Sequence, residues 1–278
     1  MQESQINMNR LLTPPPAETH HAASAGPKID CSTCLVGRIC LPASLTSTAT
    51  DCQMVQRRIK IVRGDHLYQL GEPVGDRFYA VRYGSFKTYH LDPGGLQRIV
   101  GFHISGDHMA LDTMGLTNHR CGAIALEDSE VCEISYDCLH ARREALIPLQ
   151  RHFYTMLSKE IAREQDAALL LRNTRAEQRL TAFLLGISLR YAARGYSSTS
   201  FRLHMSRQDI ADFLGLTPES VSRLLFGLKS QGLLEVSGRA VTVLDAAGLQ
   251  RLAGGYVSPP PADEAETRQP QLATAHAA

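Results

Sequence analysis

The amino-acid sequence predicts an α+β protein with two differently built folded units joined by a long helix. Between about residues 55 and 140, turn-forming Gly, Pro and Asp recur roughly every ten residues between short apolar segments, the pattern of an all-β sandwich or roll. A long helical segment follows from about residue 146. Residues 205–244 then have the pattern of a winged helix-turn-helix. A chain of 278 residues is long enough for both units to bury a core.

The β unit is expected to contain a series of short strands. RRIKIV is followed by the turn RGD, and HLYQLGEP leads to DRFYAVRYGSFKTYHL. The turn PGG precedes QRIVGFHIS, and AIALEDSEVCEIS adds two more short strands.

The segment LIPLQRHFYTMLSKEIAREQDAALLL is expected to form one helix, because it has no Gly and its Pro lies near the start. One row of positions in it follows alternating four- and three-residue steps. This row could be a buried core face or a homodimer seam, and the length and central place of the helix favour the seam. The small Ala168 and a like-charge approach of Glu164 to its own copy would weaken the dimer. The expected dimer contacts are Leu157, Ile161, Glu164, Ala168 and Leu171.

After a further helix, RAEQRLTAFLLGISLRYAARG, two short helices joined by a tight turn are expected. Ser206 can cap the first helix, and Gly215 lies at the bend. Thr217 can cap the second helix, whose first position suits Pro218 because no amide hydrogen is needed there. A hairpin around Ser237-Gly238 would form the wing. The residues expected to be buried are Ile210, Ala211 and Leu214 in the first helix and Val221, Leu224, Leu225 and Leu228 in the second.

The outward face of the second helix carries Glu219, Ser222 and Arg223 at spacings that place all three on one side. In a helix-turn-helix this part of the second helix points at base edges in the major groove. Arg can donate two hydrogen bonds to guanine, Glu can accept from cytosine, and Ser can contact a base or a phosphate. The alternative is a solvated face with a local Glu–Arg pair worth about 0.2–0.5 kcal/mol. The surrounding motif favours base reading.

Charge and composition limit the partners and the compartment. Residues 172–239 contain ten Lys and Arg against five Asp and Glu, although the whole chain has a net charge of only +1. This local excess favours an anionic partner for the C-terminal unit. The sequence has no apolar run long enough to span a membrane and no signal peptide, so we expect a cytoplasmic protein without a membrane partner.

Three of the seven cysteines, Cys31, Cys34 and Cys40, are spaced C-x2-C-x5-C near the N-terminus. In a reducing compartment, clustered cysteines favour a metal or redox site over disulfide bonds. An iron-sulfur cluster is typically held by four thiolates, so a fourth cysteine must come from elsewhere. Zinc also accepts four thiolates, and the residues alone leave both metals open. The candidates for the fourth ligand are Cys52, Cys121, Cys132 and Cys138.

Several motifs together resemble the CRP/FNR family, and within it the oxygen-sensing fumarate and nitrate reductase regulators of the FNR type. The most specific are GFHISGD, SEVCEIS, QDAALLL and ESVSRLL, and the resemblance covers residues 30–254. It implies a cyclic-nucleotide-binding-type β-roll, a long dimerisation helix and a C-terminal winged helix-turn-helix. It also implies that Glu219, Ser222 and Arg223 read a TTGAT half-site within a TTGAT-N4-ATCAA palindrome. The expected segments are a disordered extension (1–29), the cluster loop and β-roll (30–145), the dimerisation helix (146–173), the DNA-binding unit (174–254) and a disordered tail (255–278).

The resemblance further implies a cofactor and a mechanism. FNR-type regulators have their fourth cysteine in a V-C-E-I context, which here contains Cys132. Without oxygen, a [4Fe-4S] cluster would hold the N-terminal loop on the β-roll and promote a homodimer that binds double-stranded DNA. Oxygen would break the cluster down and separate the dimer. Activation would need contacts with RNA polymerase, for which we consider the loop from Asp112 to Asn118. The expected ligands are Cys31, Cys34, Cys40 and Cys132.

Two other functions agree with parts of the sequence. A cyclic-nucleotide-responsive regulator of the same fold needs an Arg and a Ser for the phosphate and a Glu for the ribose. Here Cys121 follows Arg120, and Gly106-Asp107 stands where a Gly-Glu pair is needed. A regulator of this kind, or one that responds to another small ligand, would carry a zinc or thiol site at the cysteines. A thiol oxidoreductase would need its C-x-x-C pair in a βαβ unit, and the sequence has none. The sequence has no motif for nucleophilic or acid–base catalysis, so we do not expect an enzyme.

Overall fold

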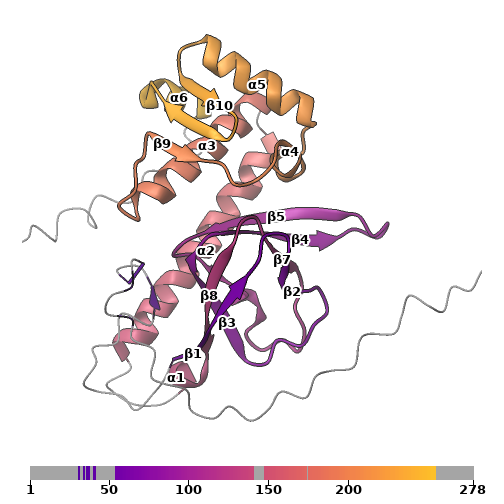
Figure 1. Ribbon diagram of the computed structural model, residues 1–278, viewed down its shortest axis with the longest axis vertical. Helices are drawn as coiled ribbons and strands as arrows, with labels where there is room; N and C mark the ends of the chain where they lie inside the picture. The colour runs from indigo at the N-terminus through magenta and orange to yellow at the C-terminus, as the bar shows by residue number, and fades with distance from the viewer. Residues whose placement is uncertain are drawn as a thin grey trace, which may run out of the picture.

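The structure is a computed structural model that describes residues 31, 34, 36, 37, 40, 41, 54–140, 147–173 and 175–254. Cys52, the predicted extension over residues 1–29 and the predicted tail over residues 255–278 lie outside this part of the chain. Figure 1 shows a β unit and a mainly helical unit, with helix α2 (Ile147–Asn173) beside the first and leading to the second. The predicted α+β fold class is confirmed.

The β unit is a roll of two four-stranded antiparallel sheets. One has the strand order β1-β8-β3-β6 and the other the order β2-β7-β4-β5. Each predicted strand segment forms a strand here, and the two-residue strand β6 was not predicted because it is too short to show alternation. The strands are β1 (Val55–Ile61), β2 (His66–Tyr68), β3 (Arg77–Tyr83), β4 (Ser85–Leu91), β5 (Gln97–Ile104), β6 (His108–Met109), β7 (Gly122–Ala125) and β8 (Ser129–Ser135).

Strand β8 lies at the centre of the first sheet, and all seven of its residues are buried. Cys132 of β8 is opposite Arg58 of β1 and Ala80 of β3. A strand that is paired on both edges and covered on both faces has little freedom to move. Cys132 is therefore held in a rigid part of the roll.

Two short helices, η3 (Leu111–Thr113) and α1 (Asp137–His140), belong to the roll, and the N-terminal half of α2 packs against it. Leu149 and Phe153 of α2 are almost fully buried. The Phe153 ring lies 5.9 Å from Phe78 and 6.1 Å from Tyr136, measured between ring centroids. Aromatic pairs at such distances add to the free energy gained from burying their area. The roll and the first turns of α2 therefore share one apolar cluster.

The second unit is a winged helix-turn-helix, as predicted. The Ser206 hydroxyl accepts from the Asp209 amide in a capping box, and Gly215 ends α4 with a φ of 62°, which favours glycine. Thr217 caps α5, and Pro218 occupies its first turn. The elements are α3 (Ala176–Ala192), β9 (Ser200–Arg202), α4 (Arg207–Leu214), α5 (Pro218–Ser230), β10 (Leu234–Ser237), β11 (Ala240–Val243) and α6 (Ala246–Ala253).

Two details of this unit differ from the prediction. The wing contains a third strand, β9, which pairs with β11 and buries only Phe201, so its sequence has too few apolar positions to show a strand pattern. Leu224 is half-buried rather than buried, because it lies at the margin of the core formed by Val221, Leu225 and Leu228. The other residues predicted to be buried in α4 and α5 are buried.

Candidate functional site

The described N-terminal cysteines lie in a chain of tight backbone turns. The amide of Cys34 donates to the carbonyl of Cys31 (3.2 Å), and the amide of Cys40 donates to the carbonyl of Val36 (3.0 Å). Turns of this kind bring side chains three to six positions apart within reach of one another. The spacing of the three cysteines is thus matched by the compact path of the backbone.

This cysteine loop packs on the β-roll beside Cys132. Cys40 and Cys132 are buried members of one apolar cluster, and Cys31 and Cys34 pack against it. The cluster also contains Leu149 and Phe153 of α2. We call this group of four cysteines with its apolar surroundings the cysteine neighbourhood.

The protonation of these thiols reflects their burial and their closeness. Burial above all, together with the nearby Cys31 and Cys34, raises the pKa of Cys132 to about 11 against the lowering effect of Arg58. The pKa of Cys40 is also raised, first by burial and then by the other three thiols of the group. Because their pKa values are raised, the thiols of Cys40 and Cys132 are neutral at pH 7. Binding of a metal centre would release their protons.

Of the remaining cysteines, the structure describes the surroundings of Cys121, which lies apart from this group. Cys121 packs against a different apolar cluster, next to Tyr68. The side chain of Cys138 and the whole of Cys52 lie outside the part that the structure describes. Among the described residues, no three His, Cys, Asp or Glu side chains are arranged closely enough to hold a single metal ion. The four thiols of the cysteine neighbourhood therefore share one environment without converging on one point.

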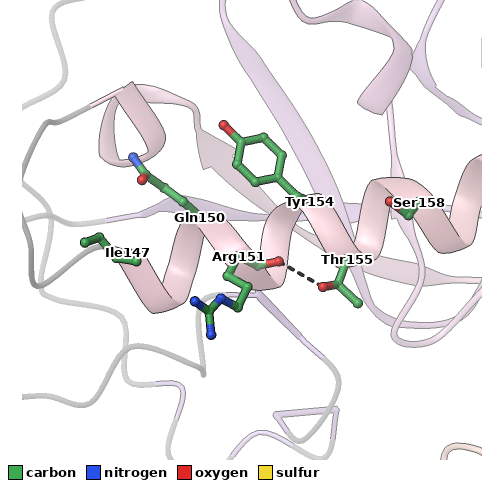
Figure 2. Close-up of a pocket in the computed structure, with 6 residues that line it drawn as sticks. All are labelled: Ile147, Gln150, Arg151, Tyr154, Thr155 and Ser158. Carbon is green, nitrogen blue, oxygen red and sulfur yellow. Dashed lines mark hydrogen bonds between the residues drawn. The ribbon is translucent and has the colours of Figure 1, made fainter.

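Most of the predicted dimer row is exposed on α2. Ile161 is 58% exposed, and Glu164, Ala168 and Leu171 are exposed too, whereas Leu157 is half-buried against the cluster of the cysteine neighbourhood. Toward the start of α2 lies a shallow pocket, and Figure 2 shows its lining along the helix. The pocket residues are Ile147, Gln150, Arg151, Tyr154, Thr155 and Ser158.

Sequence reasoning missed the arginine that accompanies Glu164. The Arg163 guanidinium lies 3.7 Å from the Glu164 carboxylate and also pairs with Glu160. A cation beside Glu164 offsets part of the repulsion that was expected between the two copies of this carboxylate. The i, i+1 spacing gave no signal, because adjacent helical residues do not normally face each other.

The three predicted base-reading residues are exposed on the first turns of α5. The Ser222 hydroxyl donates to the Pro218 carbonyl (2.9 Å), and Arg223 donates to the Ser220 hydroxyl (3.3 Å). No ion pair joins Glu219 and Arg223 among the described residues; hydrogen bonds from the Glu219 amide and the Thr217 hydroxyl instead hold the pKa of Glu219 below its ordinary value. An ionised carboxylate and a guanidinium without a carboxylate partner can both contact base edges.

The residues considered for binding a cyclic nucleotide are either paired with other side chains or exposed. Asp107 pairs with Arg190 of α3 and with Arg194 in the turn that follows α3, so its carboxylate is already neutralised. Arg120 is exposed. Tyr68 stacks on His119 at 4.0 Å between ring centroids, and both rings are buried within the roll.

No helix in the described part of the chain is both long and apolar enough to cross a bilayer.

Comparisons with known proteins cover both folded units. The model of the cyclic nucleotide-binding domain matches residues 58–144, and the model of the Crp-like helix-turn-helix domain matches residues 178–252. The second match contains the whole α4–turn–α5 motif. Together the two matches account for most of the described residues.

Curated relatives are similar over nearly their full lengths. The transcriptional regulatory protein btr of Bordetella pertussis is 42% identical over 81% of this chain and 93% of its own length. The transcriptional activator protein anr of Pseudomonas aeruginosa is 37% identical over 83% of this chain and 95% of its own length. The fumarate and nitrate reduction regulatory protein of Salmonella typhimurium is 37% identical over 83% and 93%, respectively.

Solved structures share the architecture. FixK2 of Bradyrhizobium japonicum is similar with a TM-score of 0.63 and 30% identity, over 70% of this chain and 96% of that one. TTHA1359 of Thermus thermophilus, a transcriptional regulator of the CRP/FNR family, has a TM-score of 0.55 at 20% identity, over 72% and 100%, and shares the fold. With both domains matched and relatives above one-third identity along most of the chain, this protein belongs to the CRP/FNR family of transcription regulators and is not an enzyme.

Proposed function

We propose that this chain is an oxygen-responsive regulator of anaerobic transcription. Several relatives carry names that refer to anaerobic regulation or to fumarate and nitrate reduction. One observation of the structure carries the proposal further: four cysteines from two distant parts of the chain lie in one apolar cluster together with the start of α2.

The donor set of the cysteine neighbourhood fits a [4Fe-4S] cluster. Fe–S clusters are held by Cys thiolates, typically four, and Cys31, Cys34, Cys40 and Cys132 provide four sulfur donors with an apolar surround. When bound, the cluster would supply an iron centre that oxygen can oxidise. The four residues would hold it, and Arg58, next to Cys132, would reduce the negative charge that four thiolates bring.

The apolar contacts link the cysteine loop to the proposed dimer helix. Leu41 of the loop is fully buried in the cluster that contains Leu149 and Phe153 of α2. A loop ordered by a bound iron-sulfur cluster would stabilise this end of α2. A loop without the iron-sulfur cluster would lose part of its apolar packing against α2. An effector shifts a conformational equilibrium only if it binds one conformation more tightly than the other. The core shared by the loop and α2 would let cluster binding favour one conformation of α2.

The proposed homodimer would form through the exposed row of α2, with contacts from Leu157, Ile161, Glu164, Ala168 and Leu171. The exposed apolar side chains of Ile147, Tyr154, Ile161 and Leu171 support this assignment, because a stable monomer rarely exposes so continuous an apolar row. Glu164 would limit the strength of the dimer, and Arg163 would moderate its effect.

The dimer would bind palindromic double-stranded DNA of the TTGAT-N4-ATCAA kind through Glu219, Ser222 and Arg223. The exposure of these residues at the N-terminal end of α5 supports this role. Such a regulator would work in the cytoplasm. For RNA polymerase we propose the loop over residues 112–118, in which Met114 and Leu116 are 40% and 41% exposed.

The cyclic-nucleotide alternative finds less support. Asp107 is paired with Arg190 and Arg194, Arg120 is exposed, and Tyr68 and His119 fill part of the interior of the roll. The match to the cyclic nucleotide-binding domain therefore describes the fold of the roll.

The test is to purify the protein without oxygen, measure iron, sulfide and zinc, and record its visible spectrum and molar mass as air is added. We expect about four irons and four sulfides per chain and a dimer that dissociates in air. Colourless protein that contains zinc or no metal and stays dimeric in air would refute the oxygen-sensing proposal, while its DNA binding would be judged separately.

A further inference from the structure

The winged-helix unit is attached to the β-roll of the same chain through α3 and α4. Figure 1 shows this unit above strands β4 and β5, with α4 near β5. The polar contacts centre on carboxylates from both sides of the junction. Neither the dimer row nor the cysteine neighbourhood supplies them.

The contact with α3 and the turn that follows it centres on Asp107, in the turn between β5 and β6. One carboxylate oxygen of Asp107 pairs with Arg190 and the other with Arg194, and these partners are 83 and 87 residues away. The side chains of Asp107 and Arg194 are each only 10% exposed. The Ile104 amide donates to the same carboxylate (2.7 Å), so Asp107 is held in place by its own turn. Burial raises the pKa of Asp107, but the arginines outweigh it and hold the pKa well below its ordinary value.

The contact with α4 uses Lys87 of β4. Its ammonium lies 2.6 Å from Asp209, and the two side chains are 19% and 12% exposed. The other oxygen of Asp209 accepts from the amide (2.8 Å) and the hydroxyl (2.7 Å) of Ser206. One carboxylate therefore both caps α4 and joins it to the roll. Three residues further along the same face, Asp212 accepts from the amide of Ile99 on the edge strand β5 (2.5 Å).

Apolar packing runs through the same junction. Phe102 of β5 belongs to the hydrophobic core of the winged-helix unit. Its ring centroid lies 5.3 Å from Phe213 of α4 and 5.9 Å from Phe183 of α3. A junction with a packed aromatic core and paired buried charges resists rotation of one unit against the other.

The junction leaves the DNA-reading face free. Glu219, Ser222 and Arg223 are exposed, so the attached position does not block DNA. A dimeric helix-turn-helix protein must place its two recognition helices about 34–36 Å apart, one turn of DNA. The position of α5 relative to α2 then depends on how firmly α3 and α4 are held by the roll.

We propose that Asp107 with Arg190 and Arg194, and Lys87 with Asp209, form an inter-unit latch that positions α5 and so sets which half-site spacing the dimer accepts. This inference rests on the proposed binding to a palindrome. The latch residues are positioning residues, and they contact no base. Loosening the latch should relax the choice of spacing while the bases preferred within a half-site stay the same.

The experiment uses full-length protein purified without oxygen and matched for iron content and dimer fraction. The preferred site is first selected from random DNA by the unaltered protein, and affinities are then measured with the spacer shortened or lengthened by one base pair. The variants are Lys87→Met, the conservative control Lys87→Arg, and Asp107→Asn as an independent change at the other contact.

We expect the unaltered protein and Lys87→Arg to lose about tenfold or more in affinity for a wrong spacer. For Lys87→Met and Asp107→Asn we expect this loss to shrink to roughly threefold, with unchanged base preference within each half-site. Full spacer discrimination in both variants would overturn the latch. An unaltered protein that binds no palindrome would instead overturn the proposed function. If Asp107→Asn does not fold, Lys87→Met still decides, because it changes a different contact of the junction and keeps the aliphatic part of the side chain.

Discussion

The two folded units build their candidate sites in different ways. In the winged-helix unit the proposed reading face consists of three residues within five positions of α5, and its geometry follows from helix periodicity and the Thr217 cap. In the β-roll the cysteine neighbourhood combines a loop around residues 31–41 with a strand about ninety residues later. One site is local in sequence and exposed, and the other is non-local and mostly buried.

The difference teaches what each site depends on. A reading face on one helix needs only that helix and its cap, so distant changes affect its position more than its chemistry. The cysteine neighbourhood forms only when β8 is paired and the loop is packed against it, because Cys132 is far from the other three cysteines in the sequence. The proposed sensing would therefore be sensitive to the core of the roll, whereas the proposed base reading would be sensitive to single surface residues. Four predictions, from the largest expected effect to the smallest, test this contrast.

The first prediction compares two cysteines of the roll. We expect Cys132→Ser to lose most of its iron, because a serine hydroxyl replaces one of four thiolate ligands. Cys121→Ser is the matched control and should keep its iron, since Cys121 lies in a different apolar cluster. Iron and sulfide analysis of anaerobically purified protein gives the answer. Iron lost from Cys121→Ser and retained in Cys132→Ser would refute the ligand assignment.

The second prediction concerns acid stability of the roll. Burial lowers the pKa of His103 to about 3 and of His108 to about 4. Below pH 6.5 these histidines are protonated in the unfolded chain but remain neutral in the folded protein. Their contribution to the free energy of unfolding is therefore fully present above pH 6.5 and is lost as the pH drops toward 4. The expected slope is about 1.4 kcal/mol per pH unit for each histidine.

Chemical unfolding at pH 7, 6 and 5 measures this slope. His108→Leu should make it shallower by about one histidine, whereas His90→Asn should leave it unchanged because His90 is exposed. Equal slopes for both variants would show that acid acts elsewhere in the protein.

The third prediction concerns the local site. Arg223→Ala should weaken binding to the selected DNA site by about 1–3 kcal/mol and relax the preference at one base pair. Arg251→Ala removes the same charge from α6, where the side chain is 74% exposed, and should change affinity little and specificity not at all. Fluorescence anisotropy with single-base variants of the site measures both. A uniform loss across all sequences would mean that Arg223 contacts a phosphate.

The smallest effect is expected on the dimer row. Glu164→Ala should strengthen dimerisation in air by less than about 1 kcal/mol, because Arg163 already offsets part of the repulsion. Asp166→Ala is a control for an exposed acidic residue of the same helix outside the row. Light scattering over a range of concentrations measures the dissociation constant. A Glu164→Ala protein that remains as monomeric in air as its parent would contradict this role for Glu164.

Much of the fold could be predicted from local patterns. The strand segments, the long helix, both caps of the helix-turn-helix and the wing hairpin follow from turn residues, periodicity and capping chemistry, which act over a few positions. The short strands β6 and β9 could not be predicted, since two or three residues carry no readable alternation. The long-range pairs Asp107–Arg194 and Lys87–Asp209, separated by 87 and 122 residues, have no local signal at all.

By itself, the sequence determined the kind of protein this is: a β-roll, a long helix and a winged helix-turn-helix, with three clustered cysteines and a polar face on α5. These features depend on near neighbours in the chain, whose interactions are encoded in spacing. The family resemblance had selected Cys132 as the fourth cysteine, and the tertiary structure places it beside the cysteine loop. Only the tertiary structure decided that this loop shares a core with α2 and that Asp107 joins the two units. Such contacts arise when distant segments pack together, because the free energy that selects them comes from the burial and pairing of groups far apart in the chain.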